Sequence, residues 1–146
     1  MKSELPVAVV MVVVVIGNMA VEADSMWNLQ PWRRQHVKIV NQLGDNRPLT
    51  VHCKSGDDDL GFHILAAGKE YEFGFQINMM GTTLFWCNFW DDRKHHAVFD
   101  VFDAKATFTV EQCGNNWCTW EPRDDGFYLF DSDSKKFIKK HLWFKI

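Results

Sequence analysis

The sequence has little that would indicate a membrane-spanning protein, a nucleic-acid-binding protein or a hydrolase with a familiar motif. Its one long apolar run, Leu5–Ile16, has twelve residues, whereas a helix that spans a bilayer needs about 20. Neither sign of charge dominates, and a formal net charge of −3 gives no electrostatic basis for binding nucleic acid. The chain also has no Gly-x-Ser-x-Gly elbow and no Asn-x-Ser/Thr acceptor. Stable membrane insertion, nucleic-acid binding and N-glycosylation at that acceptor are therefore not expected.

The short apolar run is better explained as the centre of a secretory signal peptide. Lys2 precedes the run, and the small-residue pattern Val21-Glu22-Ala23 follows it, as signal peptidase requires. The alternatives are an uncleaved anchor and a buried β-strand over Val7–Val15. We predict a cleaved signal peptide over residues 1–23 and a single secreted, extracellular domain over residues 24–146.

Four cysteines follow this segment, and an even count in an exported chain predicts two disulfides. They are Cys53, Cys87, Cys113 and Cys118. A zinc site with four thiolate ligands is the competing interpretation, since Cys113 and Cys118 are close enough in sequence to share a metal ion. It is less favoured because Cys53 and Cys87 are isolated, without the paired spacing usual in zinc sites. Three disulfide connectivities remain open. No metal or other cofactor is expected.

Short stretches in which large apolar residues alternate with other residues recur along the chain, separated by turn residues. In Lys69–Ile77 every second residue is large and apolar, as in a strand with one buried face. In Thr83–Trp90 large residues lie on both faces, so this strand is expected to be covered on both sides. The other expected strands are His36–Leu43, Leu49–Lys54, His95–Phe102, Thr107–Gln112, Thr119–Glu121, Gly126–Phe130 and Phe137–Lys145. The pattern predicts an all-β domain, built as an antiparallel sandwich or barrel.

The most polar part of the chain is the acidic stretch Cys53–Gly61, with three successive carboxylates at Asp57, Asp58 and Asp59. Carboxylate oxygens are calcium ligands, but these three lack the alternating spacing and the distant Glu of an EF-hand. Asp side chains also accept hydrogen bonds from backbone N–H groups in tight turns. We favour such a turn over a metal site.

Histidines are the candidates for catalysis, because two of them with a Lys can perform general acid and base chemistry, as in secreted ribonucleases. The chain has six: His36, His52, His63, His95, His96 and His141. His52 and His63 lie near opposite ends of the acidic stretch, while His95 and His96 are neighbours on an expected strand and so face apart. No catalytic residue is assigned. A ribonuclease that uses His52 or His63 with a nearby Lys or Asp is the enzymatic alternative.

Seven tryptophans are a high number for this length. Three lie in strand patterns and are expected in the core: Trp86, Trp90 and Trp120. Trp27, Trp32 and Trp117 fall instead in an entry segment and a turn, where burial of a large ring is less expected. Exposed aromatic rings can form a carbohydrate platform or an interface. A wall-polysaccharide-binding module that uses these three rings is therefore a further alternative.

The order of motifs along the chain carries additional information. Val37–Leu43 comes first, the sequence Cys-Lys-Ser follows at residues 53–55, and Asp-Asp-Leu-Gly follows at residues 58–61. The later motifs are Tyr71-Glu72-Phe73-Gly74-Phe75, Thr83–Phe89, Cys113, Cys118, Trp120 and Asp125–Tyr128. Together with the order of the four cysteines, they resemble the plant self-incompatibility protein homologues, small secreted proteins of the poppy stigma-determinant type.

This resemblance implies a small antiparallel β-sandwich stapled by two disulfides, without catalytic activity, that acts as a secreted ligand. In the family's named system, a pollen membrane partner recognises the stigma protein, and self pollen is rejected. Specificity is expected in surface loops, which here are Gly44–Pro48, the acidic stretch, Asn78–Gly81 and Asp91–Lys94. The candidate partner-binding residues are Arg47, Asp57, Asp58, Asp59, Asp91, Asp92 and Arg93. We therefore expect a monomeric signalling or recognition protein that binds a cell-surface receptor.

Overall fold

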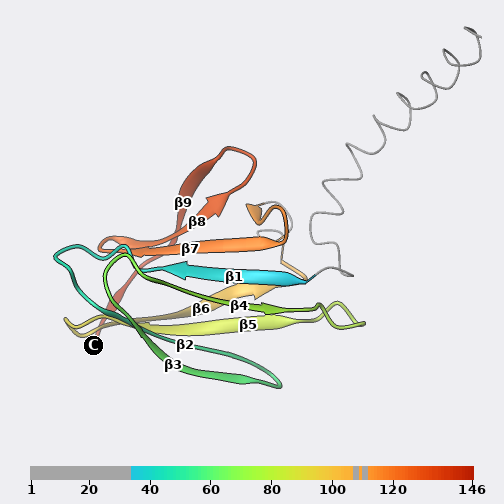
Figure 1. Cartoon of the computed structure of the whole chain (residues 1–146), viewed down its shortest axis with the longest axis horizontal. Helices are drawn as coiled ribbons and strands as arrows, with labels where there is room; N and C mark the ends of the chain where they lie inside the picture. Colours follow the sequence, from blue (N-terminus) through green and yellow to red (C-terminus); the bar gives the residue numbers. More distant parts are fainter. Residues whose placement is uncertain (1–33, 107–108, 110–111) are drawn as a thin grey trace, which may run out of the picture.

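The computed structural model describes residues 34–106, 109 and 112–146, which form ten β-strands (Figure 1). In chain order these are β1 (Gln35–Val40), β2 (Leu49–Ser55), β3 (Asp59–Leu65), β4 (Glu70–Phe75), β5 (Leu84–Trp90), β6 (His95–Asp103), β7 (Trp117–Arg123), β8 (Gly126–Asp131), β9 (Lys136–His141) and β10 (Phe144–Lys145). Within these residues, no helix has the length and apolarity needed to cross a bilayer. The expected signal peptide, Trp27 and Trp32 lie outside the described residues.

The strands form two five-stranded sheets that pack face to face (Figure 1). One sheet has the order β4-β1-β7-β8-β9, and the other has the order β10-β6-β5-β2-β3. Neighbouring strands are antiparallel except β1 and β7, which pair in parallel from His36 opposite Trp117 to Ile39 opposite Trp120. The expected all-β sandwich is confirmed. The alternation pattern does not predict the parallel pair, because its two strands are far apart in sequence and no tight turn joins them.

Alternation along the strands directs one face of each sheet into a common core. In β1, Val37 and Ile39 are fully buried, while the alternate residues His36, Lys38 and Val40 are half-buried. Aromatic rings fill the space between the sheets: the ring centroid of Phe89 lies 5.1 Å from that of Phe99 and 4.9 Å from that of Phe127. Burial of each such side chain contributes about 1.5–3 kcal/mol relative to exposure.

The outer face of β5 differs from the sequence expectation. Trp86 and Trp90 are half-buried there, and the rings nearest to Trp90 are those of Phe62 and His96, at centroid distances of 5.8 and 5.3 Å. The prediction that β5 is covered on both sides, with both tryptophans in the core, is therefore wrong. The sheet meets its partner sheet on one face only. Trp120, which is 1% exposed, belongs to the core as expected.

Both disulfides are present and all four cysteines are used. Cys53 and Cys87 face each other on the neighbouring strands β2 and β5, so this bridge links two strands within one sheet. Cys113 and Cys118 close the turn that leads into β7. The disulfide prediction is confirmed, and the zinc interpretation is wrong because no thiolate remains to bind a metal. Each bridge stabilises the fold by about 2–4 kcal/mol, largely through the unfolded chain.

Two segments differ from the expected strands. Asp59–Leu65 forms β3, which the alternation did not reveal because Gly61 interrupts it and the pairing register shifts between His52 and Lys54. Thr107–Gln112 was expected to be a strand, and most of it lies outside the described residues. Its two described residues, Thr109 and Gln112, are helical rather than extended, and the N–H group of Cys113 donates a hydrogen bond to the carbonyl of Thr109, four residues earlier.

Candidate functional site

The candidate partner-binding residues do not form one cluster, because they lie at opposite ends of the sandwich (Figure 1). In the pairing of β2 with β5, Thr50 is opposite Trp90 and Ser55 is opposite Phe85. The loop with Arg47 therefore lies beside the loop with Asp91, Asp92 and Arg93. The acidic turn between β2 and β3 lies at the other end, beside the β4–β5 loop.

The first end is organised around Arg47, which is only 6% exposed. Its guanidinium donates to Asp91 at 3.2 Å and to Asp92 at 3.5 Å, pairs with Asp124, and donates through Nε to the carbonyl of Gly44 at 3.2 Å. Burial opposes the charged form of Arg47, but Asp124 and the other carboxylates outweigh it and raise its pKa. The guanidinium is therefore neutralised within the protein and ties three loops together.

Asp91 is the buried partner of Arg47, with a side chain that is 4% exposed. Its carboxylate accepts hydrogen bonds from the N–H groups of Arg93 and His95, both at 2.9 Å, and contacts the His95 ring at 2.8 Å. Burial disfavours the carboxylate, but the bonds from His95 and Arg93 outweigh it, so the pKa of Asp91 is below its ordinary value. Arg47 and Asp91 thus hold the loops in place rather than face a partner. Asp92 and Arg93 remain exposed at the rim.

Asn41 is a residue at this end that the sequence analysis missed. It is fully buried, its amide donates to the carbonyls of Arg47 and Leu65 at 2.9 Å each, and its oxygen accepts from the N–H of Leu43 at 2.9 Å. An asparagine just after an apolar strand is common, so no local pattern distinguishes it. One of the carbonyls that it binds, that of Leu65, is 24 residues away in the sequence, so its structural role cannot be seen from neighbouring residues.

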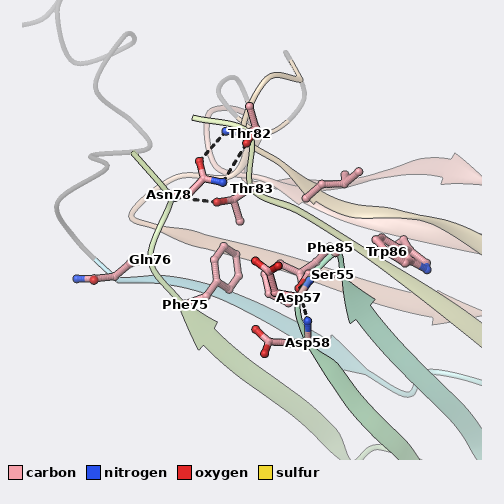
Figure 2. A pocket seen from close by; sticks show the side chains of 12 residues that line it. Ser55, Asp57, Asp58, Phe75, Gln76, Asn78, Thr82, Thr83, Phe85 and Trp86 are labelled. Carbon is pink, nitrogen blue, oxygen red and sulfur yellow. Dashed lines mark hydrogen bonds between the residues drawn. The ribbon is translucent and has the colours of Figure 1, made fainter. Parts of the chain in front are cut away.

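The second end contains a pocket of about 440 Å³ between the acidic turn and the β4–β5 loop (Figure 2). Its lining residues are Ser55, Gly56, Asp57, Asp58, Phe75, Gln76, Asn78, Thr82, Thr83, Leu84, Phe85 and Trp86. Asp57 and Asp58 are the only ionisable residues in this lining. We call this feature the acidic pocket. It combines an apolar wall with two carboxylates of the same sign.

Hydrogen bonds define the acidic turn on one side of this pocket. The hydroxyl of Ser55 accepts from the N–H groups of Asp57 and Asp58, at 3.3 and 3.0 Å, and the N–H of Ser55 donates to the carbonyl of Asp58 at 2.8 Å. The expected tight turn is present, but the acceptor of these two backbone N–H groups is the hydroxyl of Ser55 rather than an Asp side chain. The side chains of Asp57 and Asp58 are consequently not needed to form the turn.

The β4–β5 loop on the other side is equally well defined. The Asn78 side chain accepts from the N–H of Thr82 and donates to its hydroxyl, both at 2.9 Å, and the Thr83 hydroxyl accepts from the N–H of Asn78 at 2.8 Å (Figure 2). At the tip of this loop, Met79 and Met80 are 103% and 82% exposed. The loop therefore displays two large apolar side chains next to the acidic pocket.

Asp59, the third acidic residue, has a different environment from its two neighbours. It lies on β3, where its carboxylate contacts the His52 ring at 2.5 Å and accepts from the N–H of Gly61 at 2.9 Å. The bond with His52 lowers the pKa of Asp59. In the part of the chain that the structure describes, no three His, Cys, Asp or Glu residues are placed to hold a metal ion. The three carboxylates therefore do not act together.

The two histidines considered for a ribonuclease are not brought together. His52 packs on the Phe62 ring at 4.1 Å, on the outer face of its sheet. His63, by contrast, stacks on Tyr71 at 4.0 Å and contacts the carbonyl of Leu60 at 2.9 Å. Since His63 pairs opposite Val51 in the core-facing register and His52 opposite Phe62, the two rings point to different faces of the sheet.

Trp117, suspected as an exposed platform, is half-buried at the start of β7. Its ring stacks on that of His36 at 4.3 Å, and the Lys38 ammonium lies 5.2 Å from the ring centroid. Both contacts cover parts of the indole. The rings exposed on the outer face of the other sheet, such as Phe62 at 65% and Phe144 at 66% exposure, offer more apolar surface than Trp117 does.

A second pocket, also of about 440 Å³, lies between β6, β7 and β9. Its lining residues are Phe99, Asp100, Trp120, Lys140 and His141. Burial, with the nearby Asp103, raises the pKa of Asp100, and burial with Lys140 lowers the pKa of His141. Both shifts disfavour the charged forms of these two side chains. Sequence analysis missed it because its residues come from three strands distant in sequence.

Comparison with protein families agrees with the motif order found in the sequence. The family model of plant self-incompatibility protein S1 matches residues 36–143. S-protein homolog 24 of Arabidopsis thaliana is 36% identical over 134 residues, which is 91% of this chain and 87% of that protein. S-protein homolog 3 of the same plant is 32% identical over 144 residues, 98% of this chain and 93% of that protein.

A solved structure has the same fold. It is described as that of SPH (self-incompatibility protein homologue) proteins, a widespread family of small, highly stable, secreted proteins from plants. It superposes with a TM-score of 0.57 at 20% identity, over 76% of this chain and 95% of the solved chain. This likeness supports the β-sandwich fold.

Proposed function

The chain belongs to the plant self-incompatibility protein S1 family and is secreted, and we propose that it is a non-enzymatic ligand for a cell-surface receptor protein. The observation that carries this proposal is the acidic-pocket end of the sandwich, where two hydrogen-bonded loops display Met79, Met80, Asp57 and Asp58. Exposed apolar side chains beside unneutralised charge are typical of recognition surfaces on rigid scaffolds.

The rigidity of this end favours recognition over catalysis. Loops that are already ordered lose little conformational entropy when a partner binds, which increases affinity. His52 and His63, the candidates for acid and base chemistry, point to different faces of the sheet. We further propose a monomer of one domain over residues 24–146. Its partner is a protein rather than a nucleic acid, in keeping with the net charge of −3 of the full chain.

Photo-crosslinking on plant cells tests the receptor role. A benzoylphenylalanine at position 79, in the exposed loop, should form a light-dependent adduct with one membrane protein, and excess unlabelled wild-type protein should abolish it. The matched control carries the same group at Ser134, an exposed residue of the β8–β9 turn, and should give much less adduct. Absence of saturable binding to any tested cell surface would contradict the receptor role. RNA cleavage by the pure wild-type protein, together with loss of this cleavage in His52→Ala, would also contradict the receptor role.

A wall-polysaccharide-binding module is the second candidate, and the outer face of the β10-β6-β5-β2-β3 sheet supports it. Trp90 lies there between the rings of Phe62 and His96, and His96 contacts the Asn88 side chain at 3.0 Å. Sugar rings stack on such aromatic side chains and hydrogen-bond to neighbouring polar groups. Binding on a glycan array that Trp90→Ala removes, with Trp117→Ala as the control, would favour this function over the receptor role.

A further inference from the structure

The acidic pocket has a composition that indicates the chemistry of its occupant. Its wall includes the aromatic and aliphatic side chains of Phe75, Leu84 and Trp86, and its only ionisable groups are two carboxylates. We propose that the pocket binds an arginine side chain from an extended, apolar-flanked segment of the receptor. This inference rests on the proposed receptor-ligand function and names the group that the receptor supplies.

The charge of the pocket supports a cationic occupant. No hydrogen bond or ion pair joins the Asp57 or Asp58 carboxylate to another of the described residues, whereas Asp59 contacts His52 and Asp91 contacts Arg47. Two neighbouring carboxylates of like sign gain most from a positive group placed between or beside them. A neutral or anionic group would leave this charge uncompensated.

The apolar wall favours arginine over an inorganic cation. A guanidinium is planar and weakly hydrated, accepts contact with aromatic rings on its faces, and donates several N–H bonds from its edge. Asp57, Phe75 and Phe85 all line the pocket (Figure 2), so a carboxylate and aromatic rings are available to the same occupant. No group of three or more His, Cys, Asp or Glu side chains that could hold a metal ion occurs among the described residues, here or elsewhere.

Apolar residues next to the arginine also have a place to bind. Met79 and Met80 project from the β4–β5 loop, which borders the pocket through Asn78, Thr82 and Thr83. Unbranched methionine side chains adapt to partners of varied shape. The segment that binds is therefore expected to combine one arginine with at least one large apolar neighbour.

Nuclear magnetic resonance with a defined probe tests this inference on the full mature protein. The probe is the peptide acetyl-Gly-Leu-Arg-Leu-Gly-amide, and the control peptide replaces arginine with uncharged citrulline. The amide signals of Gly56, Asp57, Asp58, Thr82 and Thr83 should shift with the arginine peptide. The citrulline peptide should bind about tenfold more weakly, because it lacks the charge that the carboxylates attract.

A pair of variants with equal net charge separates local from general electrostatics. Asp57→Asn with Asp58→Asn should weaken binding of the arginine peptide about tenfold. Glu72→Gln with Asp133→Asn removes two exposed acids outside the pocket and should change binding by less than about twofold. Equal losses in the two double variants would overturn the inference. Equal binding of the two peptides, or the same signals shifting with calcium chloride alone, would also overturn it.

Crosslinking with the same variants distinguishes a failure of this inference from a failure of the proposed function. If Asp57→Asn with Asp58→Asn captures the receptor as well as the wild type does, the pocket is not the arginine site and the receptor role stands. If the arginine peptide binds in the pocket as expected but no cell surface captures the protein, the pocket chemistry stands and the receptor role is wrong.

Discussion

At the end of the sandwich that contains Arg47, charged side chains pair with one another, whereas at the opposite end Asp57 and Asp58 are exposed and line the acidic pocket. Both ends consist of short loops between strands, and at each end one of these loops links the two sheets. The two ends differ in how many oppositely charged side chains the fold places within ion-pair distance of one another. At the first end, the Arg47 guanidinium pairs with three carboxylates, and these ion pairs hold the loops together. At the second end, Asp57 and Asp58 have no cationic partner among the described residues, so their charge is available to a binding partner.

This difference shows why charged loop residues cannot all be counted as binding residues. A buried ion that loses its partner is costly, because its removal from water is no longer compensated. An exposed ion without a partner costs little and can attract a ligand. The following substitutions test whether the two ends differ in this way, beginning with the largest expected effect.

Arg47→Ala should lower the free energy of unfolding by about 3–5 kcal/mol, because it leaves the buried Asp91 carboxylate without its cation. Urea unfolding at neutral pH measures this. Arg93→Ala is the matched control: Arg93 pairs with Asp45 at 3.2 Å, but both side chains are more than half exposed, so its loss should cost less than about 1 kcal/mol. Similar losses for the two variants would remove the distinction between a buried network and an exposed pair.

Acid should weaken the Arg47 end through Asp91. The folded-state pKa of Asp91 is below its ordinary value of 3.8, so the unfolded chain takes up this proton first as the pH falls. The stabilisation is complete above pH 3.8 and is lost as the pH falls through the folded pKa. Unfolding measured from pH 7 to pH 2 should show this loss. Asp91→Asn should be less stable at pH 7, and its free energy of unfolding should fall less steeply as the pH is lowered. An unchanged acid dependence would contradict the assignment of this loss to Asp91.

Ser55→Ala should lower the free energy of unfolding by about 1 kcal/mol, since the Ser55 hydroxyl accepts two backbone N–H bonds in an exposed turn. The same variant should broaden the amide signals of Gly56 to Asp58, because the turn that forms one side of the acidic pocket loses its order. Ser134→Ala, in the β8–β9 turn, is the control. Unchanged amide signals in Ser55→Ala would show that the turn does not depend on this hydroxyl.

Asp57→Ala with Asp58→Ala should have the smallest effect on stability, within about 0.5 kcal/mol, because both carboxylates are exposed and the turn forms without them. Thermal unfolding measures it. Adding Asp59→Ala should destabilise further, since that change removes the contact with His52 and the bond from Gly61. A large loss in the double variant would mean that the acidic turn is structural, like the Arg47 end.

The limits of prediction from sequence can be traced to particular residues. Thr83–Trp90 was correctly expected to be a strand, but its tryptophans were assigned to the core because alternation shows two faces without showing what covers them. The sequence does not predict a strand over Asp59–Leu65, since Gly61 and the lack of regular alternation between polar and apolar residues are typical of a loop. The Cys53–Cys87 bridge could not be distinguished from the other pairings, because it depends on β2 and β5 being neighbours.

The sequence by itself determined the fold class, the use of the cysteines in two disulfides and the family, because period-two alternation, an even cysteine count and ordered motifs are properties of the chain read in one dimension. Only the tertiary structure decided that Arg47 is neutralised while Asp57 and Asp58 are not. Partners separated by 44 and 77 residues supply that neutralisation, and the distance between two charges in space, which sets their interaction energy, follows from strand pairing rather than from sequence separation.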